Sequence, residues 1–487
     1  MIRLSKSRYT RGVSCPKALW LDLYKPEAAE AVIDPRLAEQ GTEVGRLAQD
    51  LYGPHVTVEY SPDHARMLED TEKYLARGEK VICEASFATD GCYCSADVLR
   101  NLGNGHVIMT EVKSSTVIDP MYLHDCSFQT YVIESCGYTV DRIILTHINS
   151  GYVRKGAIDI QQLFLQEDIT EKVRELLPGV PDRIRSLREE LEKGEPGTAI
   201  GPDCPACAYW SYCSENLPHP NVFDLTGAEC NKNKKWKLYL EGAVSFPQLA
   251  ERTDLKERQR LTVTGAEKTD AQAVRDFLRT IPLPVYHLDF ESSQEAVPPY
   301  DDSRPYQQIP FQYSLHIVRK EGEEPEHKEF LAEDANADPR RALAESLCRD
   351  IPADACVTAY NMAFEKTRIR ELADLFPDLA EHLLSIRDNI RDLMTPFQKL
   401  YCYRPAMQGS YSIKHVLPAL CPDDPELDYH ALEDVHNGTE ATSAFLSMRK
   451  QTGEELAKTR KNLLRYCRLD TLAMVRVWEK LKEMAEG

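Results

Sequence analysis

The sequence predicts an α/β protein with more than one domain. Its 487 residues are more than one hydrophobic core usually supports. Two regions combine β-branched and aromatic runs with helical stretches, one over about 81–154 and one from about 276 to the end. We therefore expect an N-terminal α/β domain over 1–218, a mostly helical linker over 219–275 and a C-terminal α/β domain over 276–487.

The first α/β region has strand-like runs on both sides of one helical stretch. The runs are VICEASF (81–87), CYCSADVLR (92–100), HVIMTEVKSS (106–115) and RIILTHI (142–148). The helical stretch MYLHDCSFQTYVIESCG (121–137) ends on a glycine, a common helix-stop signal. These elements predict a mixed sheet with a crossover helix, followed by a long charged helix over about 169–194.

The second α/β region starts at RTIPLPVYHLDF (279–290), after a Lys-rich segment with a helical pattern. The prolines at 282, 284, 298 and 299 are its turn and boundary signals. No internal repeat precedes or interrupts it.

The composition, with 42% hydrophobic and 28% charged residues, is that of an ordinary globular protein. No apolar run is long enough to cross a bilayer, and the basic first twenty residues lack the apolar region of a secretory signal. We therefore expect a cytoplasmic protein with no membrane partner. In that reducing compartment, fifteen cysteines indicate metal ligation and buried thiols rather than disulfide bonds.

The formal net charge of −19 argues against a passive nucleic-acid binder, which gathers lysine and arginine to displace counterions. It does not exclude a nuclease, because carboxylates that hold divalent cations bring positive charge to the scissile phosphate. The basic N-terminus and NKNKKWK (231–237), which contains Trp236, are two patches able to guide a strand. A solvated helix face is the alternative for the second patch.

A group of residues with catalytic chemistry lies in CYCSADVLRNLGNGHVIMTEVKSS (92–115). Its Asn104-Gly105 pair suits a hairpin turn, and Asp97 and Glu111 are equidistant from position 104. In such a hairpin they lie opposite one another, about 5 Å apart at Cβ, and they repel unless a cation lies between them.

Lys113 shares the face of Glu111, because the two are two residues apart on a strand. Asp97 and Glu111 are therefore expected to hold Mg2+ or Mn2+, while Lys113 orients water or stabilises charge developing on a phosphate. The alternative is a surface salt bridge, which an isolated Glu-x-Lys on a strand usually forms.

A cysteine cluster follows in GPDCPACAYWSYCSE (201–215), with Cys204, Cys207 and Cys213 at C-x2-C-x5-C spacing. No His-x3-His pair follows, as a zinc finger would require, so a fourth ligand must come from elsewhere.

The hairpin, followed by a helix with Gln129, resembles the PD-(D/E)XK nuclease core of the RecB type, which implies a restriction-endonuclease-like fold and a catalytic role for Gln129. In the iron–sulfur branch, which includes AddB-type repair nucleases and CRISPR-adaptation exonucleases, one cysteine lies far upstream of three at this spacing. SRYTRGVSCPKALWL (7–21) supplies it as Cys15. The resemblance thus implies a 4Fe-4S cluster on the four cysteines, stapling the two ends of the domain. By spacing alone a four-cysteine zinc site fits as well, and buried thiols without a metal are a third alternative.

Two features depart from the pattern of that branch. Many relatives carry a metal-contacting histidine on an early helix, where this chain has Thr42 and Glu43 in EQGTEVGRLAQDLYG. The helix motif is often Q-x3-Y, but Ile133 stands at the fourth position after Gln129. The acid-lysine core is intact, and the departures bear on the efficiency of cleavage.

The C-terminal region contains three fragments in the order D-x-E, N-x3-E and Y-x3-D. Asp289 and Glu291 share one face of a strand, and Glu365 lies where a strand runs into a helix. Tyr466 and Asp470 lie one above the other on a helix. In this order the fragments resemble the exonuclease motifs of the DnaQ-like DEDD family in its tyrosine form, which implies a ribonuclease H-like fold.

One stretch supports this second resemblance and one residue departs from it. GSYSIKHVLPAL (409–420) is similar to the serine-lysine stretch that precedes the last helix in those enzymes. The second motif normally ends in Asp, whereas this chain has Glu365, one methylene longer.

The second resemblance implies two-metal hydrolysis. Asp289, Glu291 and Asp470 would hold an inner ion that activates water, and Glu365 with Asp289 would position a second ion near the leaving oxygen. Tyr466 is expected to orient the water, because a tyrosine hydroxyl with a pKa of about 10 is a poor base.

Nearly the whole chain resembles a family of bacterial fusion proteins that join an iron–sulfur RecB-type nuclease to a DnaQ-like exonuclease. The stretches that carry the resemblance are LSKSRYTRGVSCPKALWL, TEVKSSTV, RPYQQIPFQYSLH and YCRLDTLAM. We expect a metal-dependent nuclease acting on DNA that has free ends or is single-stranded, in repair, defence or end processing. The alternatives are RNase D-like processing of RNA 3′ ends and a non-catalytic nucleic-acid-binding scaffold.

Overall fold

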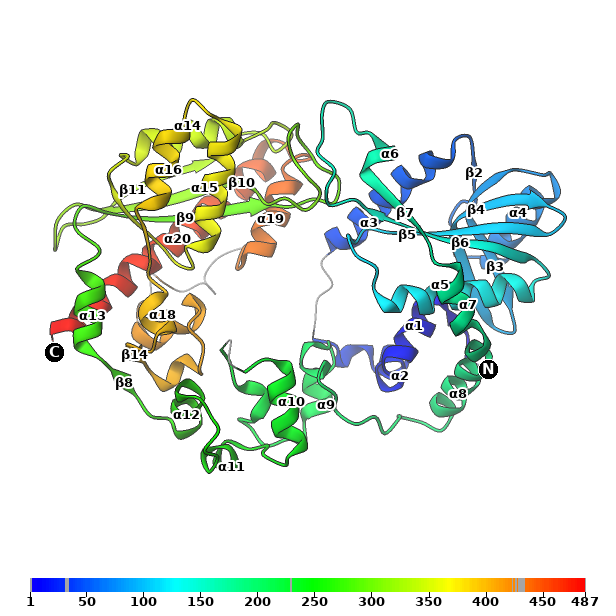
Figure 1. Cartoon of the computed structure of the whole chain (residues 1–487), viewed down its shortest axis with the longest axis horizontal. Helices are drawn as coiled ribbons and strands as arrows, with labels where there is room; N and C mark the ends of the chain where they lie inside the picture. Colours follow the sequence, from blue (N-terminus) through cyan, green and yellow to red (C-terminus); the bar gives the residue numbers. More distant parts are fainter. Residues whose placement is uncertain are drawn as a thin grey trace. The chain divides into compact units, whose positions relative to one another are not determined.

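The structure is a computed structural model that describes residues 2–30, 35–227, 230–422, 424, 427 and 434–486. The chain forms two compact units (Figure 1). Unit 1 comprises Met1–Glu215 and Glu295–Gln307, and unit 2 comprises Asn216–Gln294 and Gln308–Gly487. Both units combine β-sheets with helices, so the predicted α/β class is confirmed.

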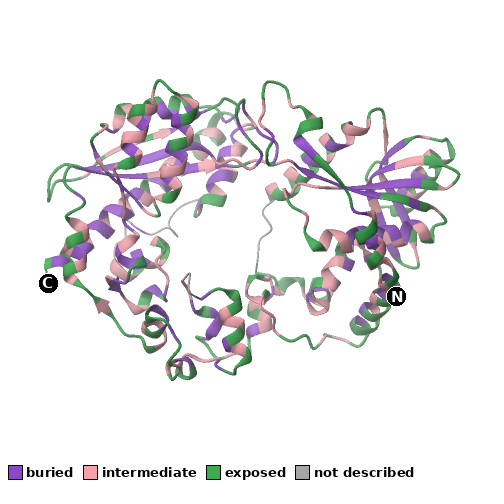
Figure 2. Cartoon of the chain, in the orientation of Figure 1, coloured by how far each residue is buried: buried purple, intermediate pink, exposed green. Residues whose placement is uncertain are grey.

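Unit 1 is built on a seven-stranded sheet in the order β2-β3-β4-β5-β6-β7, with β1 beside β4. The strands are β1 (Leu4–Ser5), β2 (Val56–Thr57), β3 (Val81–Thr89), β4 (Cys92–Gly103), β5 (His106–Lys113), β6 (Thr139–Ile148) and β7 (Phe164–Asp168). Strands β3, β4 and β5 are antiparallel neighbours, whereas β5 and β6 are parallel and are joined by α5. The central strands are largely buried (Figure 2). The mixed sheet with a crossover helix is thus present as predicted.

The helices of unit 1 cover this sheet. They are α1 (Lys6–Ser14), α2 (Pro16–Tyr24), α3 (Pro35–Gln49), α4 (His64–Ala76), α5 (Pro120–Ser135), α6 (Ile160–Leu163), α7 (Thr170–Leu176), α8 (Val180–Glu192) and α9 (Trp210–Ser214), with 3-10 turns at Pro26–Ala28, Asp50–Tyr52, Leu177–Gly179 and Cys204–Ala206. Helix α1 is firmly anchored. Its Tyr9 is fully buried and stacks on Phe128 of α5, with ring centroids 4.7 Å apart. A Cβ atom at Gly12 would lie 2.8 Å from Leu187 Cδ1 of α8, so glycine lets the two helices approach closely.

The single helix predicted over about 169–194 is wrong. The chain instead forms α7 and α8, joined by the 3-10 turn Leu177–Gly179. Pro178 and Pro181 explain the break, because proline has no N–H to donate and clashes with the preceding turn of a helix.

The segment Glu295–Gln307 belongs to unit 1, although it lies in the sequence between two strands of unit 2. Its Ala296 and Val297 are buried with side chains of α3, β6 and α6. Arg154 Nη1 donates hydrogen bonds to the carbonyl oxygens of Pro298 and Pro299, at 3.0 and 2.7 Å. Pro298 and Pro299, two of the four prolines that the sequence marked as boundary signals, therefore anchor this segment within unit 1.

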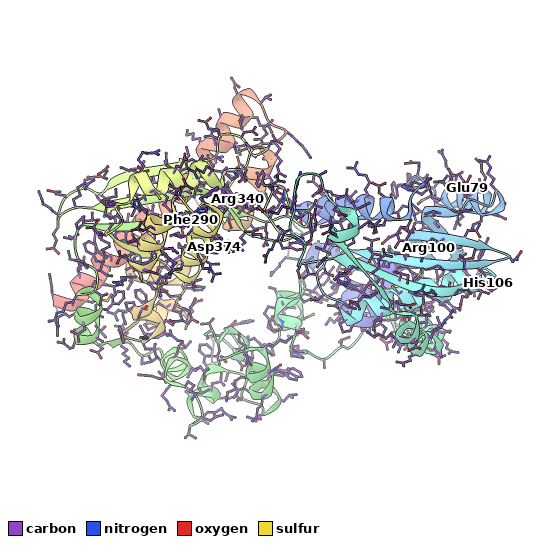
Figure 3. All side chains as sticks on the ribbon, turned by 45° about the horizontal axis from the view of Figure 1, so that its top comes forward. Glu79, Arg100, His106, Phe290, Arg340 and Asp374 are labelled. Atoms are coloured by element: carbon purple, nitrogen blue, oxygen red, sulfur yellow. The ribbon has the colours of Figure 1, made fainter. Side chains whose placement is uncertain are left out.

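Unit 2 contains a five-stranded sheet in the order β11-β10-β9-β12-β13 and a two-stranded sheet of β14 and β8. The strands are β8 (Lys268–Thr269), β9 (Val285–Ser293), β10 (Ile309–Val318), β11 (Glu326–Leu331), β12 (Cys356–Ala359), β13 (Ile390–Asp392) and β14 (Cys402–Tyr403). The central strand β9 is antiparallel to β10 and parallel to β12. Leu288 and Phe290 of β9 (Phe290 is labelled in Figure 3) are buried in one core cluster, which leaves Asp289 and Glu291 for the opposite face of the strand.

The helices of unit 2 are α10 (Lys232–Leu240), α11 (Phe246–Ala250), α12 (Glu257–Thr264), α13 (Ala271–Leu278), α14 (Arg340–Asp350), α15 (Ala363–Leu375), α16 (Ala380–Asp388), α17 (Thr395–Gln398), α18 (Ile413–Leu420), α19 (Gly438–Ser447) and α20 (Gly453–Glu486), with 3-10 turns at Val222–Asp224 and Pro405–Met407. Helix α20 has 34 residues and packs on β9, β10 and α13. In the described part of the chain, no helix combines the length and the apolar character needed to span a membrane.

Candidate functional sites

The first candidate site lies on the hairpin of β4 and β5 in unit 1. Asn104 and Gly105 have φ angles of 54° and 80°, the left-handed conformation that a tight hairpin turn requires. Continuing the register of the paired residues places Asp97 opposite Glu111, as the sequence predicts. The carboxylate of Asp97 is held by the backbone, because its Oδ2 accepts the N–H of Val112 at 2.7 Å.

Glu111 is the centre of a charged hydrogen-bond network. Lys113 Nζ lies 2.7 Å from Glu111 Oε1 and 2.7 Å from Asp125 Oδ2. Gln129 Nε2 donates to Glu111 Oε2 at 2.7 Å and to Asp125 Oδ1 at 2.9 Å. The structure therefore brings Asp97, Glu111, Lys113 and Gln129 together. Asp125 was missed, although its position one helical turn before Gln129 is a usable signal.

Lys6, the first residue of α1, completes this site and was also missed. Its Nζ lies 3.1 Å from Glu111 Oε1 and 3.5 Å from Asp97 Oδ1, so the ammonium group sits between the two carboxylates. The sequence placed Lys6 in a basic patch, because nothing local indicates that α1 begins beside the hairpin.

Glu84 of β3 adds another carboxylate to the same site. The register between β3 and β4 puts it opposite Asp97. Its φ of 57° is left-handed, which is rare and costly for a residue other than glycine and is found most often at functional sites. Gln49 of α3 approaches Glu84 Oε1 at 3.5 Å, whereas Glu43, in the stretch where relatives carry histidine, is exposed.

The pKa values of these acids reflect burial and mutual repulsion. Burial and the charge of Glu111 raise the pKa of Asp97 to about 6. Burial, reinforced by Asp97, raises the pKa of Glu84 to about 7. Burial acts on Glu111 in the same direction, but the ammonium groups of Lys6 and Lys113 outweigh it and lower the pKa of Glu111 to about 2. With Asp125, four carboxylates face two ammonium groups, which suits a further cation.

The four predicted cysteine ligands also come together in unit 1. Cys15 lies between α1 and α2, and the N–H of Ala18 points at its Sγ from 3.4 Å. Cys15, Cys207 and Cys213 pack in one cluster. The thiol of Cys213 has a pKa raised by burial, and Cys204, Cys207 and Cys15 also raise it.

Zinc and an iron–sulfur cluster require different spacings of the four sulfurs. The described residues include all four cysteines, yet no three of their sulfurs lie within 4.8 Å of one another. A tetrahedral zinc ion with bonds of about 2.3 Å would hold the sulfurs about 3.8 Å apart. An iron–sulfur cluster, which binds each thiolate through a separate iron, requires wider spacing.

The second candidate site gathers the acids of unit 2 around β9. Asp470 on α20, Glu291 on β9 and Glu365 on α15 all act electrostatically on Asp289. Burial and these three carboxylates raise the pKa of Asp289 well above its ordinary value. The structure therefore brings the four predicted acids into one group.

Two of these acids are buried and only partly compensated, because Lys414 lowers the pKa of Glu291, and Arg368 lowers that of Glu365, by less than burial raises it. Burial, with the charge of Asp470, raises the pKa of Glu291 to about 8. Glu365 is only 2% exposed, its Oε2 accepts no hydrogen bond, and burial raises its pKa to about 8. Because a buried carboxylate oxygen without a partner is costly, this site also fits a divalent cation.

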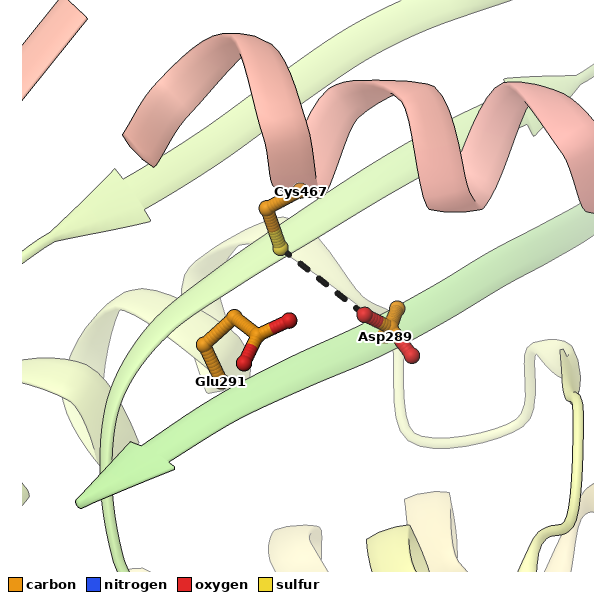
Figure 4. Close-up of side chains that lie close together, drawn as sticks. All are labelled: Asp289, Glu291 and Cys467. Carbon is orange, nitrogen blue, oxygen red and sulfur yellow. Dashed lines mark hydrogen bonds between the residues drawn. The ribbon is translucent and has the colours of Figure 1, made fainter. Parts of the chain in front are cut away.

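Cys467 on α20 is a further member of this second site and was missed. Its Sγ lies 3.9 Å from Asp289 Oδ2 (Figure 4), and one ligand atom each from Asp289, Glu291 and Cys467 lie within 4.8 Å of one another. Cys467 precedes Asp470 by three residues, hence shares its side of the helix, and this spacing is the signal in the sequence. Tyr466, one turn before Asp470, is buried at 5% exposure.

The two basic stretches make contacts within their own units. Arg11 pairs with Asp22 at 2.8 Å in unit 1, and Lys234 pairs with Asp254 at 3.0 Å in unit 2. Trp236 stacks on the ring of the neighbouring Tyr239. These contacts favour the solvated-helix alternative for residues 231–237.

Without metal, unit 2 is expected to lose stability as the pH rises from about 4.5 to about 8. Glutamate has a pKa of about 4.3 in an unfolded chain, against about 8 for Glu291 and Glu365 in the fold. Between these two pKa values the folded state binds more protons than the unfolded state. The free energy of unfolding therefore falls as the pH rises, until the pH passes the pKa of the folded state. Glu291→Gln should flatten this dependence and raise the Tm in EDTA at pH 8 by about 5 °C or more.

The measurement is thermal melting in EDTA across that pH range. The control is Glu381→Gln, an exposed glutamate on α16 of the same unit, which should follow the wild type. A Glu291→Gln curve parallel to the wild-type curve would contradict the raised pKa.

Part of the chain matches a known protein-family model. Residues 286–412 match a family model described as "Domain of unknown function (DUF2779)". The matched segment includes Asp289, Glu291 and Glu365 and ends before Cys467 and Asp470. No curated protein and no solved structure matches the chain.

Proposed function

We propose that the protein is a metal-dependent nuclease of the cytoplasm that hydrolyses phosphodiester bonds of DNA at two active sites, one in each unit. The observation that carries the proposal is the convergence, in each unit, of buried carboxylates that are far apart in the sequence. Proteins avoid such groups because burial and like charge both penalise them, unless a cation relieves the repulsion. Clustered carboxylates around divalent ions are the usual means of cleaving phosphodiesters.

Unit 1 would act as a RecB-type PD-(D/E)XK nuclease. Asp97 and Glu111 would hold Mg2+ or Mn2+, which when bound activates water and neutralises charge on the phosphate. Lys113, fixed by Glu111 and Asp125, would present its ammonium group to the charge that develops on the phosphate. Gln129 would keep the Glu111 carboxylate in place through its 2.7 Å hydrogen bond.

Unit 2 would act as a DnaQ-like exonuclease of the tyrosine type. Asp289, Glu291 and Asp470 would hold an inner ion, and Glu365 with Asp289 a second. The unpartnered oxygen of Glu365 supports its role as a ligand, even though it replaces the usual Asp. Tyr466 would orient the attacking water, and the resemblance implies cleavage from 3′ ends.

A 4Fe-4S cluster on Cys15, Cys204, Cys207 and Cys213 would tie the start of unit 1 to its end. The convergence of the four cysteines supports a shared metal group. The choice of an iron–sulfur cluster over a single zinc ion comes from the resemblance to the iron–sulfur branch of the RecB-type nucleases.

The proposal is tested by incubating the purified protein with labelled single- and double-stranded DNA and RNA in Mn2+, Mg2+ or EDTA. We expect DNA to be cleaved with either metal and no cleavage in EDTA. Preferential cleavage of RNA from its 3′ ends would favour RNase D-like processing. Intact substrates under every condition would favour the non-catalytic scaffold.

Removal of Lys6 is expected to tighten Mn2+ binding to unit 1. Its ammonium group lies between Asp97 and Glu111, the two carboxylates that would hold the ion. Two unit charges 4 Å apart interact by about 4 kcal/mol near a protein surface, so Lys6→Met should lower the Kd for Mn2+ by about tenfold or more. The measurement is the electron paramagnetic resonance signal of free Mn2+, in a background of Asp289→Asn and Asp470→Asn that silences unit 2.

The control for this experiment is Arg8→Met, which removes a positive charge from an exposed position of the same helix. Asp97→Asn should weaken Mn2+ binding, and this variant verifies that the ion binds at the hairpin. Unchanged or weaker binding in Lys6→Met would contradict competition between Lys6 and the ion.

A further inference from the structure

We propose that the site in unit 2 also binds zinc, through Asp289, Glu291 and the thiolate of Cys467, and that zinc bound there blocks the reaction. The zinc site itself does not depend on the proposed function. The inhibition does, since it presumes that unit 2 is an exonuclease.

The three side chains lie almost close enough together to bind one zinc ion. They come from two elements, β9 and α20, and point toward one another (Figure 4). Cys467 Sγ lies 3.9 Å from Asp289 Oδ2, and the three ligand atoms are within 4.8 Å of one another. Tetrahedral zinc with bonds of about 2.3 Å to sulfur and about 2.1 Å to oxygen places these atoms about 3.6 Å apart. The three side chains therefore need to move only slightly toward one another to bind a zinc ion.

A further buried acid and an entry path adjoin the three ligands. Glu365 is only 2% exposed, and its Oε2 has no hydrogen-bond partner. The charge of its carboxylate acts on both Asp289 and Glu291. Its oxygen lies outside the group of three ligand atoms, so we expect water in the fourth position, as in other zinc sites with three protein ligands. Cys467 is fully buried while Asp289 is half-buried, so an ion reaches the sulfur from the carboxylate side.

The thiol of Cys467 makes this site prefer zinc over the Mg2+ or Mn2+ that the proposed hydrolysis uses. Mg2+ and Mn2+ prefer oxygen ligands, whereas zinc binds thiolate strongly. On binding, the thiol releases its proton to solvent and the thiolate coordinates the ion. Zinc held in this way occupies Asp289, the residue that both catalytic ions would share, so it excludes them.

The direct test uses Co2+ as a spectroscopic substitute for zinc on the full-length protein in excess Mg2+. Wild-type protein should show a thiolate-to-cobalt charge-transfer contribution that zinc removes, and Cys467→Ser, which keeps the four cysteines of unit 1 and their absorption, should lack that contribution. Cys402→Ser is the matched control, because Cys402 is an equally buried cysteine of unit 2 on β14. Loss of a group that only hydrogen-bonds to a metal ligand weakens metal sites about 10–100-fold, so loss of the ligand Cys467 itself should raise the zinc Kd at least about tenfold.

Inhibition provides the functional test. Zinc should inhibit 3′-end cleavage in the wild type and Cys402→Ser, and Cys467→Ser should need at least about tenfold more zinc for half-inhibition of its own uninhibited rate. Cys467→Ala serves as the second variant if serine disturbs the fold, as judged by melting. Identical cobalt spectra for wild type and Cys467 variants overturn the zinc site. A Cys467-dependent band in a protein that cleaves nothing supports the zinc site and counts against the proposed exonuclease.

Discussion

Protein purified without oxygen is expected to be brown, to absorb at about 400 nm, and to lose colour and stability when Cys207 becomes alanine. Cys15 lies between α1 and α2, and the other three proposed ligands lie about two hundred residues later at the end of unit 1. A metal group that joins them contributes its binding free energy to folding. Because about 3 kcal/mol changes the Tm of a domain of this size by roughly 10 °C, Cys207→Ala should lower the melting temperature of unit 1 by at least that amount.

The control for the cluster is Cys136→Ala, which removes an exposed cysteine of the same unit. This variant should keep the colour and the wild-type melting curve. Iron and sulfide analysis should give four of each per chain. A colourless preparation with one zinc ion per chain would overturn the iron–sulfur assignment and leave the four-cysteine site intact.

The two proposed active sites are expected to be separable by mutation. Asp97→Asn or Lys113→Ala should reduce one nucleolytic activity at least about hundredfold and leave the other, because metal ligands and charge-stabilising groups contribute that much to catalysis. Asp289→Ala or Asp470→Ala should do the reverse, removing cleavage from 3′ ends and release of mononucleotides. The measurement is product length and polarity on end-labelled DNA with Mn2+.

Stability distinguishes metal-binding carboxylates from structural ones. Asp289→Ala relieves repulsion among buried acids, so this variant should melt no lower than wild type in EDTA. Asp350 is the structural control, because it accepts a hydrogen bond from Tyr313 and pairs with Lys328. Asp350→Ala should lower the Tm. If Asp289→Ala melted much lower than wild type in EDTA, the acids of unit 2 would have a structural role.

Local patterns were enough to predict the parts of each site that lie on one element. The Asn104-Gly105 turn sets the register that puts Asp97 opposite Glu111, and alternation on β9 places Asp289 and Glu291 on one face. Pro178 also marks the break between α7 and α8, a local signal that was available but not used.

Local sequence patterns could not predict the contacts between elements that are far apart in the sequence. Lys6 reaches the hairpin because Tyr9 and Gly12 pack α1 against α5 and α8, and none of these contacts has a periodic signature. Glu84 joins the site through strand pairing and a left-handed backbone, which no pattern predicts for glutamate. The assignment of residues 295–307 to unit 1 likewise depends on tertiary packing alone.

The measurement that tests the central claim most directly is cleavage of labelled DNA in Mn2+ by the double variant Lys113→Ala with Asp289→Ala. Each substitution removes a residue on which one proposed site depends, Lys113 beside Glu111 and Asp289 among the acids around β9. If both groups are catalytic, each single variant retains one activity and the double variant, folded as judged by melting, cleaves neither ends nor interior bonds. A folded double variant that cuts DNA as fast as wild type would show that neither group is an active site.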